Sequence, residues 1–221
     1  MKTAYFKNRQ EAGELLADRL FDRYRYEDTA VVALNDGGVV VGEPIASRLH
    51  SILTMIVSKP ITLPGDSLEI GAMSQGGNFA YNNQLSSMEI DGYVSEFHHH
   101  LEDQKRNANK YINRLLGDGG AFDRDLLMDR ALILVADGLS SSSIIAAAME
   151  YLKPVRTKKT IVALPVTTVQ VVDFVHLNVD EVQILDVKAN YMGVDHYYDD
   201  NSMPSHEEIV DKLNKNILNW R

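Results

Sequence analysis

The sequence has no cysteine among its 221 residues, which excludes disulfide bonds and thiolate chemistry. Lysine and arginine form no run, and the formal net charge is -9, so most of the surface would repel a nucleic-acid backbone. No apolar run approaches the length of a bilayer span, and the first residues, MKTAYFKNRQ, lack the apolar segment of a signal peptide. We therefore expect a cytoplasmic protein that binds neither nucleic acid nor membranes.

The residues that are present have the composition of an ordinary globular protein, with 45% hydrophobic and 24% charged residues. Short apolar runs alternate along the chain with segments of helical periodicity. The apolar runs are AVVALN, SILTMIVS, RALILVA, KTIVALPV and EVQILDV. Strands that alternate with helices predict an α/β fold, in which a doubly wound, mostly parallel sheet carries helices on both faces.

Two regions depart from this alternation. The stretch KPITLPGDSLEIGAMSQGGNFAYNN is rich in glycine and proline, which predicts a β-hairpin or flap that stands off the main sheet. A polar helical pattern follows and predicts a long exposed helix near residues 95–116. We therefore expect residues 1–221 to form a single domain with a flap and a helical lobe inserted at about 58–118.

A helix is also predicted at the N-terminus, over NRQEAGELLADRLFDRY. Asn8 is followed three residues later by Glu11, which is the spacing of a capping box. Apolar residues then recur at helical spacing, so this helix has one face that packs on a core.

Two predicted strands end in turns that contain glycine and an acidic residue. AVVALN runs into Asp36, Gly37 and Gly38, and RALILVA runs into Asp137 and a row of serines. Serines at a helix start are common N-caps, but hydroxyl and backbone N–H groups there also suit an anion. The carboxyl ends of parallel strands lie at one sheet edge, so we expect the two turns to face a common ligand crevice.

Six segments, in this order along the chain, resemble the type I phosphoribosyltransferases, in the branch usually described only as predicted phosphoribosyltransferases. They are FKNRQEAGELLADRL, VVALNDGGVVVGEPIASRL, SKPITLPGDSLEIGAM, ALILVADGLSSSSIIAAAMEYL, TIVALPV with DEVQILDV, and YMGVDHYYDD. The resemblance covers nearly the whole chain. It implies a protein that holds 5-phosphoribosyl 1-pyrophosphate (PRPP) with magnesium and transfers phosphoribosyl to a nitrogen nucleophile while pyrophosphate leaves.

The resemblance also implies roles for particular residues. The phosphate and ribose of the ligand would be bound by a loop comprising Asp137, Gly138, Leu139, Ser140, Ser141, Ser142 and Ser143. Ser141 stands at a threonine position of the family and keeps its hydroxyl. Asp137 would bind ribose hydroxyls, although the family carries two adjacent acidic residues where this chain has Ala136 and Asp137. The alternative for Asp137 is a turn residue at a helix entry.

The pyrophosphate loop would consist of Asn35, Asp36, Gly37 and Gly38. Asp36 stands where the family often has a basic residue, and a carboxylate 4 Å from a phosphate charge costs about 4 kcal/mol at an effective dielectric constant of about 20. A magnesium ion shared by Asp36 and the diphosphate would turn this repulsion into coordination. The alternative is an Asn-Asp-Gly turn without a ligand. Lys59, at the position of a family lysine, would then be the cation for the leaving pyrophosphate, and its alternative is a solvated lysine.

Two functions follow. The first is a phosphoribosyltransferase-like protein that binds PRPP or another ribose phosphate and transfers phosphoribosyl, with Asp137 and Lys59 as catalytic residues. The second is a catalytically impaired protein of the same fold that binds a phosphorylated ribose or nucleotide in a regulatory role. Either would have a small-molecule ligand, with magnesium as the expected cofactor if PRPP is bound, and would suit a homodimer.

Overall fold

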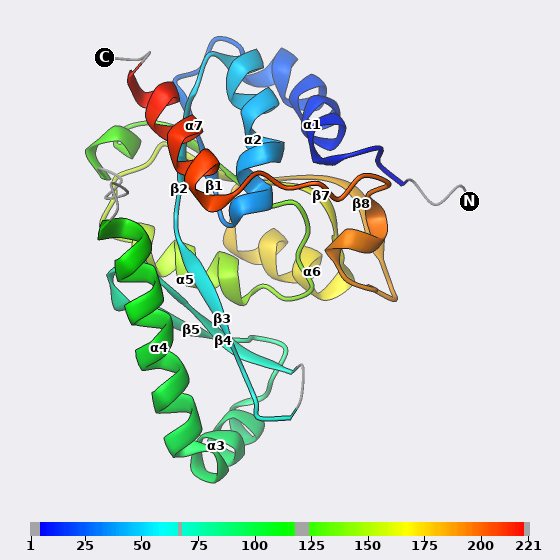
Figure 1. Ribbon diagram of the computed structural model, residues 1–221. Coiled ribbons are helices and arrows are strands. Elements are labelled where there is room, and N and C mark those ends of the chain that lie inside the picture. The colour runs from blue at the N-terminus through cyan, green and yellow to red at the C-terminus, as the bar shows by residue number, and fades with distance from the viewer. Residues whose placement is uncertain (1–4, 66–67, 118–123, 219–221) are drawn as a thin grey trace. The chain divides into compact units, whose positions relative to one another are not determined.

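The computed structural model describes residues 5–65, 68–117 and 124–218, and these form two compact units. The first unit is made of the described parts of residues 1–55, 122–140 and 155–221. The second unit is made of the described parts of residues 56–121 and 141–154. Each unit is therefore assembled from separate stretches of the chain (Figure 1).

The first unit is built on a parallel sheet, which within the described residues has five strands in the order β2-β1-β6-β7-β8. All residues of β1, β2 and β6 are buried, as expected of strands covered on both faces. The strands are β1 (Thr29–Ala33), β2 (Ile52–Met55), β6 (Ala131–Val135), β7 (Lys159–Thr168) and β8 (Glu181–Lys188). The predicted α/β fold with a parallel sheet is confirmed.

Helices cover this sheet on both sides. Figure 1 shows α1 (Arg9–Tyr24) and α2 (Asp36–Leu49) side by side on one face and α6 (Val169–Asn178) on the other. The last helix, α7 (His206–Leu218), packs on α2 and β2. Two short 3-10 helices, η2 (Arg124–Leu127) and η3 (Val194–Tyr197), lie in the connections.

The start of α1 follows the sequence pattern in part. The side chain of Asn8 accepts a hydrogen bond from the backbone N–H of Glu11 at 2.9 Å, as the capping spacing predicts. The carboxylate of Glu11, however, accepts from the backbone N–H of Lys7 rather than that of Asn8. The helix is therefore capped, but without the reciprocal bond of a full capping box.

The second unit contains an antiparallel sheet, which within the described residues has three strands in the order β3-β4-β5. Its strands are β3 (Ser58–Thr62), β4 (Glu69–Ser74) and β5 (Phe79–Tyr81), with η1 (Gln75–Gly77) between the last two. Its helices are α3 (Ser87–Glu96), α4 (His98–Gly117) and α5 (Ser143–Leu152). Both α4 and α5 pack on the sheet, and the hydroxyl of Ser74 donates to the carbonyl of Ala147 at 2.8 Å.

The lobe predicted at about 58–118 falls inside this second unit, and its predicted end at residue 118 lies outside the described residues. The unit extends further than the predicted lobe, because it also takes in α5. Among the residues that the structure describes, no helix is long and apolar enough to cross a bilayer.

One element prediction was wrong. The single strand predicted over SILTMIVS is two strands, because β2 ends at Met55 and β3 begins at Ser58; Ile56 and Val57 between them are buried, so the apolar pattern does not mark the break. The long helix predicted near 95–116 is confirmed as α4 (His98–Gly117), and α3 (Ser87–Glu96) precedes it as a separate helix. They are separated at Phe97, whose backbone (φ -110°, ψ 22°) leaves the helical region.

Candidate functional site

The turns that follow β1 and β6 meet at one edge of the parallel sheet, as predicted. The two strands are neighbours, and Ala33 pairs with Val135 at their carboxyl ends. Beyond them the side-chain amide of Asn35 donates to Oδ1 of Asp137 at 2.8 Å. The sequence pattern therefore located correctly the place where these polar residues gather.

The predicted loop over residues 35–38 is helical rather than open, so this part of the prediction was wrong. Asn35 is the N-cap of α2, and its side chain accepts from the backbone N–H of Gly38 at 2.6 Å. Asp36, Gly37 and Gly38 form the first turn of the helix. An acidic residue is favourable there, because its charge interacts with the positive end of the helix dipole. Asp36 is half-buried, and its binding of pyrophosphate or magnesium stays a prediction.

Close packing explains why two glycines stand in this turn. A Cβ atom at Gly37 would overlap the carboxylate of Asp137, and one at Gly38 would lie 2.6 Å from the carbonyl oxygen of Val135. The start of α2 therefore packs directly against the residues that follow β6. This packing requires glycine at both positions whether or not an anion binds.

Asp137 is buried in an ion pair. It is 4% exposed, and its Oδ2 accepts from Nε of Arg9, itself 4% exposed, at 2.7 Å. The same guanidinium donates to Asp195 at 2.8 Å and to the side chain of Asn201 at 3.2 Å. Burial alone would lower the pKa of Arg9, but the hydrogen bonds of Asp137 and Asp195 and the charge of Asp137 outweigh it and raise that pKa. Arg9 is therefore a permanent cation against Asp137.

Aromatic residues complete this cluster. The hydroxyl of Tyr198 donates to the carbonyl of Asp137 at 2.5 Å, and the guanidinium of Arg9 lies 4.7 Å from the centre of the Tyr198 ring. Burial and the charge of Asp137 raise the pKa of Tyr198, so its hydroxyl stays a donor. The hydroxyl of Tyr191 lies 2.7 Å from where a Cβ of Gly138 would stand. The aromatic segment near residue 198 thus covers the turn after β6.

Sequence reasoning missed Arg9, although a signal was available. Arg9 stands one turn before Ala12 and Gly13 and two turns before Leu16, all of which are buried on the inner face of α1. A charged residue on an apolar stripe is expected only where it has a partner. Neither Asp195 nor Asn201 carries a comparable signal, because both lie in the connection between β8 and α7.

The serine loop (residues 138–143) runs from the first unit into the second, and its first half is attached to the end of β7. The hydroxyl of Thr167 donates to the carbonyl of Leu139 at 2.9 Å, and that of Thr168 donates to the carbonyl of Ser140 at 3.4 Å. Gly138 and Leu139 are buried, whereas Ser140 is exposed. The carbonyl oxygens of this half are therefore directed to β7.

The second half of the serine loop directs its hydroxyls into the second unit. Ser141, Ser142 and Ser143 are buried. The hydroxyl of Ser143 donates to Glu69 and lies 2.9 Å from that of Ser141, while the hydroxyl of Ser142 donates to Asn83. Ser142 is the N-cap residue of α5, yet its side chain makes no capping bond to the described backbone of that helix.

Glu69 is the half-buried carboxylate of this second cluster. Burial raises its pKa, and the hydrogen bond from Ser141 partly offsets that rise. Lys59 lies in the same unit on β3, with its Nζ 4.5 Å from the centre of the Tyr111 ring on α4. The structure thus gives Lys59 a cation–π contact, and its catalytic role stays a prediction.

The magnesium prediction also stays open. Among residues 5–65, 68–117 and 124–218 there is no group of three or more histidine, aspartate or glutamate side chains that could hold a metal ion. Magnesium that arrives with substrate phosphates needs only one or two carboxylates, so the single carboxylate of Asp36 fits this kind of site. The carboxylate of Asp137 does not fit it, because the positive charge of Arg9 lies 2.7 Å from its Oδ2 and would repel a cation.

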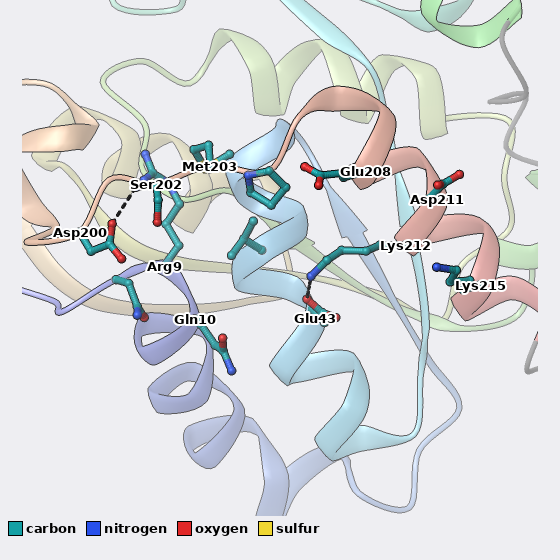
Figure 2. A pocket seen from close by; sticks show the side chains of 13 residues that line it. Arg9, Gln10, Glu43, Asp200, Ser202, Met203, Glu208, Asp211, Lys212 and Lys215 are labelled. Carbon is teal, nitrogen blue, oxygen red and sulfur yellow. Dashed lines mark hydrogen bonds and ion pairs between the residues drawn. The ribbon is translucent and has the colours of Figure 1, made fainter.

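A cavity of about 600 Å³ opens in the first unit beside Arg9. Figure 2 shows it between the start of α1, the outer face of α2, residues 200–204 and α7. Its charges are mixed, and Lys212 pairs with Glu43 across it at 2.6 Å. Arg9 is the one lining residue that also contacts Asp137, within the part of the chain that the structure describes.

Comparisons with known proteins give distant relatives. No protein-family model matches the chain. Two curated proteins from the CDC 1551 and H37Rv strains of Mycobacterium tuberculosis, named provisionally as phosphoribosyl transferases, are each 24% identical over 214 residues. The match covers 95% of this chain and 46% of each relative, so the chain spans about half the length of these relatives.

Among solved structures, TT1426 from Thermus thermophilus is similar with a TM-score of 0.71 and 23% identity, over 96% of this chain and 98% of that one. A protein from Aquifex aeolicus, AQ2163, matches with a TM-score of 0.50 and 9% identity, over 81% of this chain and 73% of that one. These likenesses concern the fold. Together with the names of the curated relatives, they confirm the resemblance to type I phosphoribosyltransferases that the six segments predict.

Proposed function

Taking this phosphoribosyltransferase-like fold as the premise, we propose that the protein binds a phosphorylated ribose or nucleotide and is impaired in phosphoribosyl transfer. The observation that carries the proposal is the buried ion pair of Arg9 and Asp137. The other candidate, a working transferase, is the alternative that the experiment below distinguishes.

The ion pair weakens the ribose site without abolishing it. A carboxylate offers about four acceptor positions, so Asp137 can still accept from one ribose hydroxyl beside Arg9 and Asn35. The neighbouring acidic residue is replaced by Ala136, which is fully buried. Loss of one hydroxyl–carboxylate hydrogen bond costs about 1.5–3 kcal/mol, or one to two orders of magnitude in affinity.

The ion pair impairs phosphoribosyl transfer more than it impairs ligand binding. The ribose becomes cationic in the transition state of such reactions, and a carboxylate held close to it contributes electrostatic stabilisation. Arg9 neutralises Asp137 and brings its own positive charge to the same place. The ion pair therefore opposes the charge that transfer must develop.

The diphosphate end has a separate requirement. Asp36 repels a diphosphate, and magnesium would supply the bridging cation between them. A ligand with a single phosphate has no such need. We therefore expect ribose 5-phosphate to bind without magnesium and PRPP to bind only with it.

The test is isothermal titration of the protein with ribose 5-phosphate and with PRPP, each with and without magnesium. Asp137→Asn should weaken both ligands, and Asp36→Asn should let PRPP bind without the metal. Asp103→Asn on α4, an exposed carboxylate paired with Arg106, is the matched control and should change nothing. Pyrophosphate release is measured in parallel with a mixture of nitrogenous bases.

Base-dependent pyrophosphate release that disappears in Asp137→Asn would establish the working transferase instead. If neither ligand binds under any condition, both functions fail.

A further inference from the structure

Two serine hydroxyls of the second unit, those of Ser141 and Ser143, bind a carboxylate. Glu69, at the first position of β4, accepts from the hydroxyl of Ser143 and is hydrogen-bonded with Ser141. Both serines are buried, and their hydroxyls lie 2.9 Å apart. The carboxylate is thus bound by the hydroxyl groups that precede and begin α5.

Under the proposed function, these are the hydroxyls that meet the ligand phosphate. Carboxylates and phosphates are both anionic oxygen acceptors that favour the same donors and the same positive end of a helix. Glu69 therefore competes with a phosphate for Ser141 and Ser143. Two anions close together in this site would repel each other, because a protein environment screens their charges much less than water does.

Two lysines on neighbouring elements contact other groups. Lys59 on β3 lies over the ring of Tyr111, and Lys105 on α4 lies over the ring of Phe79 and pairs with Glu102. On α5, Glu150 pairs with Lys153. Burial raises the pKa of Glu69, and the hydrogen bond from Ser141 is the opposing influence. The carboxylate of Glu69 is thus held by hydroxyls. Its protonation would remove the repulsion between Glu69 and a bound phosphate.

We propose that Glu69 sets the charge preference of the serine loop: it holds Ser141 and Ser143 as an internal anion, and a phosphate ester binds there as Glu69 takes up one proton. The inference rests on the proposed function and adds that ligand binding is coupled to proton uptake by Glu69. The proton comes from solvent and forms an O–H bond on the Glu69 carboxylate. The Ser143 hydroxyl then leaves this carboxylate and donates to a phosphate oxygen.

The test is isothermal titration with ribose 5-phosphate near pH 7.5, where its phosphate is mostly a dianion because the second pKa is about 6. The titration is repeated in buffers of different ionisation enthalpy, so that the observed heat reports the number of protons taken up. Wild type should take up about one proton per ligand bound. Its affinity should also fall about tenfold per pH unit above neutrality.

Glu69→Gln should bind ribose 5-phosphate more tightly near pH 8, with proton uptake close to zero. Glu102→Gln on α4 of the same unit is the matched control, because its carboxylate is exposed and paired with Lys105, and it should behave as wild type. Ser143→Ala is the second variant if Glu69→Gln does not fold. This variant removes a donor that stabilises the ionised carboxylate of Glu69. More of Glu69 is then protonated before the ligand binds, so proton uptake on binding should drop below that of wild type.

Binding to wild type without proton uptake, unchanged in Glu69→Gln, would overturn this inference and leave the proposed function standing. Absence of binding to both wild type and Glu69→Gln would overturn the two together. Binding that appears only in Glu69→Gln would support the inference in its strongest form.

Discussion

Two carboxylates, Asp137 in the first unit and Glu69 in the second, are bound in opposite ways. Asp137 in the first unit is bound by a guanidinium, whereas Glu69 in the second is bound by hydroxyls. A cation at hydrogen-bond distance stabilises the ionised form of an acid, and hydroxyls alone do not offset burial. The comparison teaches that the two acids differ in the groups that bind them: a cation binds Asp137, and hydroxyl groups bind Glu69.

The largest effect is expected from removing Arg9, the cation that distinguishes the two carboxylates. Arg9→Met leaves Asp137 buried without a counter-charge, and we expect the free energy of unfolding to fall by about 3–5 kcal/mol, measured by urea denaturation. Adding Asp137→Asn to this variant should recover much of the loss, because it removes the uncompensated charge. Arg106→Met, which breaks an exposed pair with Asp103, is the control and should cost less than about 1 kcal/mol. An equal, small loss in both variants would mean that the buried pair is not structural.

The next effect concerns the packing around the first acid. Gly37→Ala forces a methyl group into the carboxylate of Asp137, and we expect a loss of about 1–3 kcal/mol in the free energy of unfolding. Gly92→Ala in α3 is the matched control, since within the described residues no atom lies within 4 Å of its new methyl group. That control should be neutral or more stable by up to about 1 kcal/mol. A tolerated Gly37→Ala would show that α2 can move away from Asp137.

The smallest effect is the pH dependence carried by the second acid. Burial raises the pKa of Glu69, so between its ordinary pKa and the raised one the folded protein keeps a proton that the unfolded chain releases. The free energy of unfolding then falls as pH rises through that window. Glu69→Gln should therefore gain stability relative to wild type as pH rises from about 4, the ordinary pKa of a glutamate, through the raised pKa of Glu69, as measured by urea midpoints.

Glu89 supplies a control of opposite sign. Its pKa is lowered by the hydrogen bonds of Ser86 at the start of α3. Wild type should therefore lose stability relative to Glu89→Gln as pH falls through the lowered pKa, and keep its advantage near neutrality. The same slope in both variants would contradict the distinction between the two carboxylates.

The parallel sheet could be predicted from the sequence because the apolar pattern of each strand lies within a short stretch of the chain. The runs that became β1 and β6 are wholly apolar, and the polar residues directly after them had to lie at one edge once the strands were parallel. The strand break after Met55 could not be predicted, since the apolar run continues through it. The helical start at Asp36 could not be predicted either, because an Asn-Asp-Gly pattern suits a turn and a helix cap equally.

The chemistry of the site was harder to predict, because its partners lie far apart in sequence. Arg9 and Asp137 are separated by 128 positions, and Glu69 and Ser143 by 74. Neither pairing leaves a periodic pattern. The charged Arg9 on the apolar face of α1 was the available local signal, and it indicates that a partner exists without identifying Asp137.

The membership of α5 in the second unit has a consequence for how the chain is made. During synthesis β3, β4 and β5 are complete long before α5, which follows β6 in sequence. The bond from Ser74 to Ala147 spans 73 positions, so the antiparallel sheet waits for a helix that the ribosome delivers much later. Until then, apolar side chains that α5 covers stay open to mispairing. We therefore expect this face of the antiparallel sheet to be open to aggregation between the completion of β5 and the emergence of α5.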